Sequence, residues 1–311
     1  MAIRDDHVAA IRRAFPYAEQ VCRRVDVDYM VPVGEKLVTQ VEGFLRRLDE
    51  DMAAIGLGGA VVGLSSGVDS LVCALLAHRA LGAENVCKVI VDQAAADRPS
   101  PGSLLTLRLA KELGGPVVLV SIAEFVAEYR RRHRGGTWYQ GLNAQTRLVQ
   151  GAIFDAADQR AAWVISTVDR SERLLARHSE HFYGHAEPLA DLYKTEVYEV
   201  YRYLGGAGTE AQRRAGCTRW LIDHDSFWDD ELFGATWEVI DPVLHLLSER
   251  CMTAEEVAES AGLDAEWVRG IVHRMQTQVN RMTTRRLVGV RVRPDCGPPR
   301  PAPGSAGGVA S

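Results

Sequence analysis

The stretch VVGLSSGVDS, Val61–Ser70, decides the fold. It follows a glycine-rich breaker at residues 56–59 and includes most of a short apolar run over 60–64, which predicts a buried parallel strand. Small polar residues then form a turn, and residues 71–81 have the composition of a helix. In a strand–turn–helix unit, the free N–H groups and the positive end of the helix dipole face whatever lies in the turn. We therefore predict a phosphate or pyrophosphate site here.

The turn also carries side chains that suit a phosphate. Ser65, Ser66 and Ser70 offer hydroxyl donors, and Gly67 lets a ligand approach the backbone closely. Asp69 would repel phosphate unless Mg²⁺ lay between them, because Mg²⁺ binds hard oxygens and shares them with phosphates. The alternative is that Asp69 and Ser70 only stabilise the first turn of the helix. The stretch is neither a Walker A loop nor a GxGxxG loop.

Strands and helices continue to alternate beyond this unit. Further strands are predicted over 86–91, 116–122 and 163–166, with helices over 104–113 and 143–157. This alternation is typical of an α/β fold, and we predict a Rossmann-like, doubly wound parallel sheet. A helical C-terminal part follows, with helices expected over 195–204, 236–247, 254–261 and 265–282.

Composition divides the chain into three segments. Residues 1–55 are expected to form an N-terminal helical segment, and residues 56–293 hold the predicted sheet with its helical C-terminal part. The stretch over 294–311, PDCGPPRPAPGSAGGVAS, is rich in Pro, Gly and Ala and is predicted to be a disordered tail.

Composition also restricts the class of protein. The 311 residues are 47% hydrophobic and 25% charged, as in ordinary soluble globular proteins, and the net charge of −5 argues against a protein that wraps nucleic acid. We find no apolar run long enough to span a membrane and no secretory signal at the N-terminus. The six cysteines form no CxxC pair, so reduced thiols and a cytoplasmic location are expected.

The loop at 61–70 resembles the SGGxDS pyrophosphate loop of the adenine-nucleotide α-hydrolase superfamily, with Ser66 where the motif usually has Gly. Four further segments resemble, in order, those of the ammonia-dependent NAD⁺ synthetases: NAQTR at 143–147, STVDRSE at 166–172, PLADLYKTEVY at 188–198 and DDELFGATWEVID at 229–241. An Arg285-Arg286 pair stands where that family has Lys-Arg. The resemblance spans about residues 35–290.

The resemblance implies an AMP-forming amide ligase. A substrate carboxylate would attack the α-phosphate of ATP, and ammonia or another amine would then attack the acyl adenylate, with positioning and charge neutralisation supplied by the enzyme. The residues implied for the ATP pyrophosphate are Ser65, Ser66, Gly67, Asp69 and Ser70, with Thr167 near the ATP. Asp69 and Glu172 would ligate Mg²⁺, Lys194 would contact the phosphates, and Arg147, Asn143 and His185 would serve the substrate. Family analogy further implies a homodimer, and because no glutaminase domain is visible, ammonia would come from solution or from a separate partner.

Two departures from the family concern the acyl side. Only residues 185–187 separate Tyr183-Gly184 from Pro188, where NAD⁺ synthetases have a longer acidic, glycine-rich stretch. Val168 and Asp169 replace a small residue and an Asn or His. A specialised biosynthetic amide synthetase, acting on a carboxylate other than deamido-NAD, is therefore the alternative hypothesis.

Other functions are weaker interpretations of the sequence. A zinc site is conceivable in the stretch from His178 to His185, where His181 and His185 are spaced i, i+4. Gly184 interrupts the helix that would bring them together, and no third ligand is clear. Residues 253–275 have the helix–turn–helix pattern of DNA-binding proteins, although the second helix carries acids beside its basic residues. An RNA-modifying enzyme or a non-catalytic relative is a further alternative, and the presence of Asp69, Glu172 and Lys194 argues against the latter.

Overall fold

One parallel sheet organises the fold. The computed structural model describes residue 25 and residues 27–65, 67–95, 97–133, 138–175, 183–205 and 235–282. In this part of the chain, four strands lie in the order β3-β2-β1-β4. They are β1 (Ala60–Gly63), β2 (Val86–Asp92), β3 (Val117–Ser121) and β4 (Trp163–Ile165). Ala60 pairs with both Val86 and Trp163, so β1 is central and buried on both sides.

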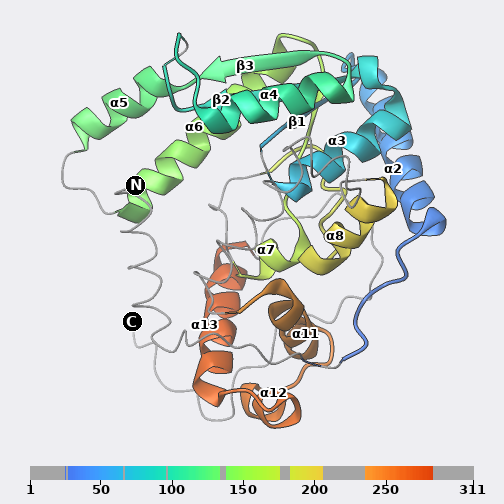
Figure 1. Cartoon of the computed structure of the whole chain (residues 1–311), viewed down its shortest axis with the longest axis vertical. Helices are drawn as coiled ribbons and strands as arrows, with labels where there is room; N and C mark the ends of the chain where they lie inside the picture. Colours follow the sequence, from blue (N-terminus) through green and yellow to red (C-terminus); the bar gives the residue numbers. More distant parts are fainter. Residues whose placement is uncertain are drawn as a thin grey trace.

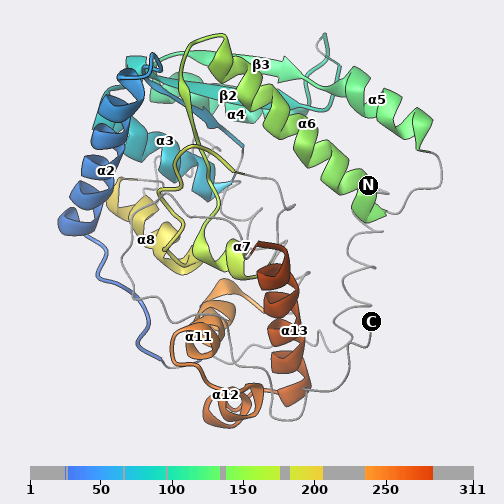
Figure 2. The same ribbon diagram turned by 180° about the vertical axis from the view of Figure 1, so that it is seen from behind.

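Helices cover both faces of the sheet. On one face lie α3 (Val68–Leu81) and α4 (Pro101–Leu113), with α2 (Glu35–Ala53) packed on α3 and the short turn η1 (Ala83–Asn85) after it. On the other face lies α6 (Trp138–Asp158), with α5 (Ala123–Arg132) beside it (Figures 1 and 2). Right-handed crossovers explain this division, because strand order advances from β1 to β3 and then returns past β1 to β4.

A close approach of α6 to β1 requires a glycine at the end of the strand. A Cβ atom on Gly63 would lie 2.5 Å from Ile153 Cδ1 of α6. On this face, Val61, Val89 and Val164 of the sheet pack against the buried side chains of α6. The strand end is therefore held tightly between the two helical layers.

Five further helices form the second part of the molecule. They are α7 (Arg170–Leu175), α8 (Lys194–Tyr203), α11 (Trp237–Ser248), α12 (Ala254–Ala261) and α13 (Ala265–Met282). Figure 1 shows α11, α12 and α13 gathered at the end of the molecule away from the sheet, with α7 and α8 in between. Their apolar core includes Trp237, Ile240, Val257, Trp267 and Ile271. Among the described residues, no helix is both long and apolar enough to cross a membrane.

The predicted fold class is confirmed, and each predicted strand is present within a residue or two of its expected bounds. The prediction of helix over residues 1–55 is wrong for 27–34, which form no regular structure before α2 begins. Pro32 and Gly34 disfavour helix there, and the N–H of Val31 donates to Glu196 Oε1 instead, at 2.6 Å. Residues 1–24 and the expected tail over 294–311 lie outside the described residues.

Candidate active site

The site lies at the carboxyl ends of β1 and β4, which are parallel neighbours in the sheet. Open α/β sheets bind ligands outside the carboxyl ends of their strands. The chain leaves β1 through residues 64–67 into α3, which carries Asp69 in its first turn. It leaves β4 through Thr167 into α7, which carries Glu172.

The loop before α3 is shaped by its own hydroxyl groups. The N–H of Ser65 donates to Ser70 Oγ at 3.1 Å, and Ser70 Oγ donates to the carbonyl of Gly67 at 2.9 Å. The N–H of Gly67 donates to Ser65 Oγ at 3.0 Å. Ser70 is buried beneath the loop, whereas Ser65 is exposed and available to a ligand. Ser66, predicted to join them, lies outside the described residues.

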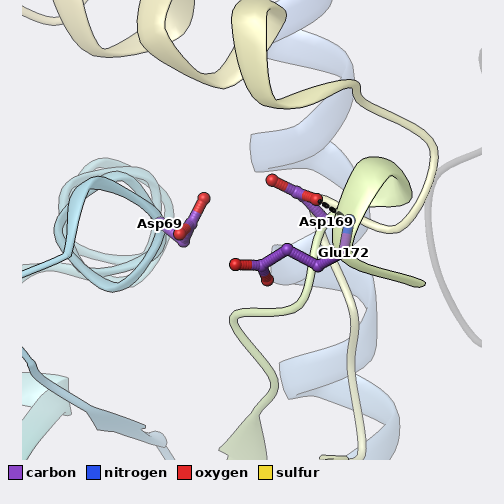
Figure 3. A group of neighbouring side chains, drawn as sticks. All are labelled: Asp69, Asp169 and Glu172. Atoms are coloured by element: carbon purple, nitrogen blue, oxygen red, sulfur yellow. Dashed lines mark hydrogen bonds between the residues drawn. The ribbon is translucent and has the colours of Figure 1, made fainter. Parts of the chain in front are cut away.

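A buried lysine joins the predicted acidic residues. Lys194 Nζ, at the start of α8, lies 2.5 Å from Asp69 Oδ2, 2.9 Å from Glu172 Oε1 and 3.0 Å from Asp169 Oδ2. Figure 3 shows the three carboxylates converging, Asp69 from α3 and the other two from the region of α7. All four side chains are buried.

Charge explains why these groups stay together away from water. The ammonium group of Lys194 donates hydrogen bonds to Asp69 Oδ2 and Glu172 Oε1, and it forms an ion pair with Asp169 Oδ2. Burial and the nearby Glu172 and Asp69 carboxylates raise the pKa of Asp169 well above its usual range, although Lys194 opposes the shift. The indole ring of Trp237 adds a cation–π contact, with its centroid 5.8 Å from Lys194 Nζ.

Asp169 is the member of the cluster that sequence reasoning missed. Its Oδ1 accepts a hydrogen bond from the N–H of Glu172 at 2.8 Å, so it caps the N-terminus of α7 (dashed line in Figure 3). Its Oδ2 is the atom that faces Lys194. The sequence marked this position only as a departure from the family, without indicating that the side chain points inward.

The cluster could hold a metal ion. One oxygen from each of Asp69, Asp169 and Glu172 lies within 4.8 Å of the others, the group of potential metal ligands found among the described residues. Carboxylate oxygens are the hard ligands that a divalent cation such as Mg²⁺ prefers. Of the histidines considered for zinc, His178 and His181 lie outside the part of the chain that the structure describes.

A cleft of about 670 Å³ lies beside the segments that lead into this cluster. It is lined by the ends of β1 and β2, the start of α4 and one side of α6, and includes Ser65, Asp92, Ser103, Ile153 and Thr167. Asp92 accepts hydrogen bonds from the N–H groups of Ala94, at 3.0 Å, and Ser100, at 2.7 Å, and so fixes the loop that forms one wall. The cleft is large enough for a nucleoside.

The residues predicted for the substrate are not brought into the cluster. Arg147 is exposed on α6, and Asn143 belongs to the same helix, with its side chain outside the described part. His185 Nδ1 accepts a hydrogen bond from the N–H of Val164 at 2.9 Å, and its ring packs near Phe154. The three substrate assignments therefore stay predictions.

The segment around His185 is held against β4. A Cβ atom on Gly184 would lie 2.5 Å from the N of Ser166, and the carbonyl of Ala186 accepts from that same N–H at 2.8 Å. Glu187 forms a buried ion pair with Arg173 of α7 at 2.6 Å. The short segment is therefore hydrogen-bonded to the end of β4 through Ala186 and ion-paired to α7 through Glu187.

The predicted helix–turn–helix pair is present as α12 and α13, and both helices pack into the core of the second part of the molecule. Gly262 adopts the left-handed conformation between them, and α13 packs against α7. Arg274 Nε donates to the carbonyl of Leu175 at 3.0 Å, and Arg269 pairs with Glu255. These contacts use two of the basic residues that the DNA-binding hypothesis needs.

Comparison with known proteins gives a consistent result. The family model described as NAD synthase matches residues 38–283. The NH(3)-dependent NAD(+) synthetase of Thermococcus kodakarensis is 28% identical over 245 residues, which cover 76% of this chain and 92% of that protein. That of Hyperthermus butylicus is 29% identical, covering 80% and 86%. The structure of the NH3-dependent NAD synthetase of Campylobacter jejuni superposes with a TM-score of 0.62 at 22% identity, over 81% of this chain and 97% of that one.

The match covers the described part of the chain from α2 to α13 and includes every member of the lysine–carboxylate cluster. It confirms the predicted resemblance and the predicted class of carbon–nitrogen ligase. The chain belongs to the NAD synthase family.

Proposed function

We propose that this chain activates a carboxylate with ATP and passes the acyl group to ammonia, forming an amide together with AMP and pyrophosphate. Membership of the NAD synthase family supports this ATP-dependent amide ligase activity. The observation that carries the proposal is the buried cluster of Lys194, Asp69 and Glu172 beside a nucleoside-sized cleft. Buried ionisable groups are costly, so a fold that gathers Lys194 and three carboxyl groups has a strong chemical reason to do so.

We place the nucleoside of ATP in the cleft and its phosphates along the loop before α3. Ser65 and Thr167 line the cleft and stand shortly before Asp69 and Asp169 in the sequence, so the chain leads directly from the cleft into the cluster. The N-terminus of α3 supplies backbone N–H groups and a positive dipole end for the phosphates.

We propose Mg²⁺ as the metal, held by Asp69 and Glu172. The three buried carboxylates offer the hard oxygen ligands that a divalent cation such as Mg²⁺ prefers. When bound, Mg²⁺ would neutralise phosphate charge and favour departure of pyrophosphate. Asp169, on the same helix turn as Glu172, is a third candidate oxygen.

Lys194 supplies a positive charge at a fixed place. Its ammonium group is oriented by three carboxylates and by the ring of Trp237, so little reorganisation is needed when negative charge develops on the leaving pyrophosphate. In this proposal, the carboxylates position Lys194 and the lysine stabilises the transition state.

Two classes of acid substrate are proposed, deamido-NAD and other carboxylates. Deamido-NAD is the first candidate, because it is the acid implied by the family. The short segment from Gly184 to Glu187 favours testing other carboxylates as well, since its backbone and side chains are occupied by contacts with β4 and α7. A homodimer in the cytoplasm, supplied with free ammonia or by a partner, belongs to the same proposal by family analogy.

The test is an endpoint assay with Mg²⁺, ATP, ammonium and deamido-NAD, in which NAD⁺ and AMP are measured by mass spectrometry. The wild-type protein should yield both in equal amounts, whereas Asp69→Asn and Glu172→Gln should abolish turnover. Glu42→Gln is the matched control, because Glu42 is a buried carboxylate paired with Arg46 and Arg79 away from the site. Full activity of both site variants would overturn the assignment. AMP formation with another acid, but not with deamido-NAD, would favour the specialised amide synthetase.

A further inference from the structure

One face of α11 is directed at the lysine–carboxylate cluster. Trp237 and Asp241 lie one helical turn apart on this helix and so share a face. The ring of Trp237 covers Lys194 Nζ, with 5.8 Å between them. Asp241 is fully buried and contacts α7 and α8 beside the residues that carry the cluster.

The carboxylate of Asp241 bridges these two helices. Its Oδ1 accepts a hydrogen bond from Ser171 Oγ at 2.6 Å, and its Oδ2 accepts from both the N–H and the Oγ1 of Thr195, each at 2.8 Å. Ser171 precedes Glu172, and Thr195 follows Lys194. The N–H of Lys194 itself donates to Ser171 Oγ at 2.8 Å. Both ends of the Lys194–Glu172 pair are therefore attached to one anchoring group.

The hydrogen-bond directions around Asp241 are fixed by its surroundings. Because Thr195 Oγ1 donates to the carboxylate, the hydroxyl of Tyr29, 2.8 Å away, donates to Thr195 Oγ1. Burial raises the pKa of Asp241 to about 7, while the hydrogen bonds from Ser171 and Thr195 oppose that shift. A carboxylate buried at such a cost, and placed at the N-terminus of α8, is suited to orienting that helix.

We infer that Asp241 is a positioning residue that ties the start of α8 to α7, and thereby holds Lys194 and Glu172 at hydrogen-bond distance. The inference rests on the proposed function for its effect on turnover. Its structural consequence is local: without the anchor, the first turn of α8 loosens and Lys194 becomes accessible, while the rest of the fold is unchanged.

The first test measures lysine accessibility in the nucleotide-free protein. Wild type and Asp241→Asn, which keeps the shape of the side chain, are treated with an amine-acetylating reagent, and modification of each lysine is followed by peptide mass spectrometry. Lys88, equally buried but located in β2, is the internal control for global opening. Asp241→Asn should raise the modification rate of Lys194 several-fold and leave Lys88 protected. Equal increases at both lysines, or none at Lys194, would overturn the inference.

The second test separates positioning from ligand binding. Replacing groups that orient active-site residues from behind typically costs 10–100-fold in activity, so kcat of Asp241→Asn should fall by about that factor with little change in KM for ATP. Glu42→Gln, the buried carboxylate control, should keep the wild-type kcat. Unchanged kcat in Asp241→Asn would contradict the inference. Absence of AMP formation by the wild type would instead contradict the proposed function, and the labelling comparison would still decide the role of Asp241.

Discussion

Two lysines in the described part of the chain are fully buried, and they have opposite surroundings. Lys194 lies at the carboxyl end of the sheet among three carboxylates. Lys88 lies in β2, where Nζ donates to the carbonyls of Gly114 and Val86 and to His78 Nε2. The first lysine faces three carboxylates, and the second has none among these hydrogen-bond partners.

The difference separates a chemical role from a structural one. The three carboxylates around Lys194 offer oxygen ligands to a further cation, such as the divalent ions that accompany phosphates. Lys88 instead caps the carbonyl that ends α4, where the helix dipole favours a positive group. Burial lowers the pKa of Lys88, the cost of holding a charge without a carboxylate. A buried lysine alone therefore does not identify an active site, whereas its partners do.

The largest effect on turnover is expected when the charge of Lys194 is removed. Lys194→Met should reduce turnover by about 10²–10³-fold, because it removes a pre-oriented charge from the transition state. Lys88→Met should leave turnover near the wild-type value, because Lys88 lies in a different part of the sheet. The measurement is kcat for AMP release in both variants.

The stability of each lysine variant must be measured, because a loss of activity could also result from misfolding. Lys194→Met leaves three buried carboxylates without their cation, which costs about 3–5 kcal/mol of stability, so urea unfolding must accompany the assay. Lys194→Arg keeps the charge but changes its geometry and should fold better while remaining impaired. If Lys88→Met lost as much activity as Lys194→Met, the division into chemical and structural lysines would be wrong.

A smaller loss of turnover is expected for replacement of Asp169, and it would show whether this residue is an essential member of the cluster. Asn is also a good N-cap, so Asp169→Asn should keep α7 intact and remove only the charge that faces Lys194. We expect a loss of kcat smaller than that of Asp69→Asn or Glu172→Gln, because those two residues are the proposed metal ligands. The same assay ranks the three variants, and a loss at Asp169 equal to theirs would make it an essential ligand.

The contrast between the lysines also shows what sequence could predict. Strands over 60–64 and 163–166 were predictable because apolar runs bounded by glycine or polar turns have few alternatives. Motif resemblance selected Asp69, Glu172 and Lys194, and the fold brings them together from three separate segments. Family patterns, rather than local propensity, carry that information.

Other features depend on packing that no local pattern reveals. Lys88 lies inside the apolar run VCKVIV, and nothing in that run predicts that its ammonium group will donate a hydrogen bond to the carbonyl of Gly114 at the end of α4. Asp169 was visible only as an unusual residue, because its contact with Lys194 spans two segments of chain. Asp241 lies at the end of a segment that resembles a family motif, but its contacts with both α7 and α8 depend on how these helices pack against α11 and could not be predicted from the motif.

The structural lysine predicts an effect on stability alone. Lys88→Met would leave the carbonyl of Gly114 without its ammonium donor, and an unsatisfied buried acceptor costs about 1–3 kcal/mol. Urea unfolding monitored by circular dichroism should show this decrease in the free energy of unfolding. An unchanged or increased stability would mean that relief from burying the charge outweighs the lost cap.

The smallest effect concerns His78, the neighbour of Lys88. Burial, and secondarily the charge of Lys88, lower the pKa of His78 to about 4, because a protonated ring 3.2 Å from an ammonium group would be repelled. The unfolded chain regains an ordinary histidine pKa near 6.5 and so binds more protons between these values. This contribution to stability is therefore complete above about pH 6.5 and is lost as the pH falls toward 4.

His78→Gln has no such group, so the difference in unfolding free energy between wild type and variant should move in the variant's favour as the pH falls from 7 to 4. Comparing the two proteins cancels groups with the opposite slope, such as Asp241, whose raised pKa makes the folded state gain stability as it takes up a proton. Urea titrations at several pH values measure the difference. Parallel pH profiles would show that His78 keeps an ordinary pKa, and that the ammonium of Lys88 does not act on its ring.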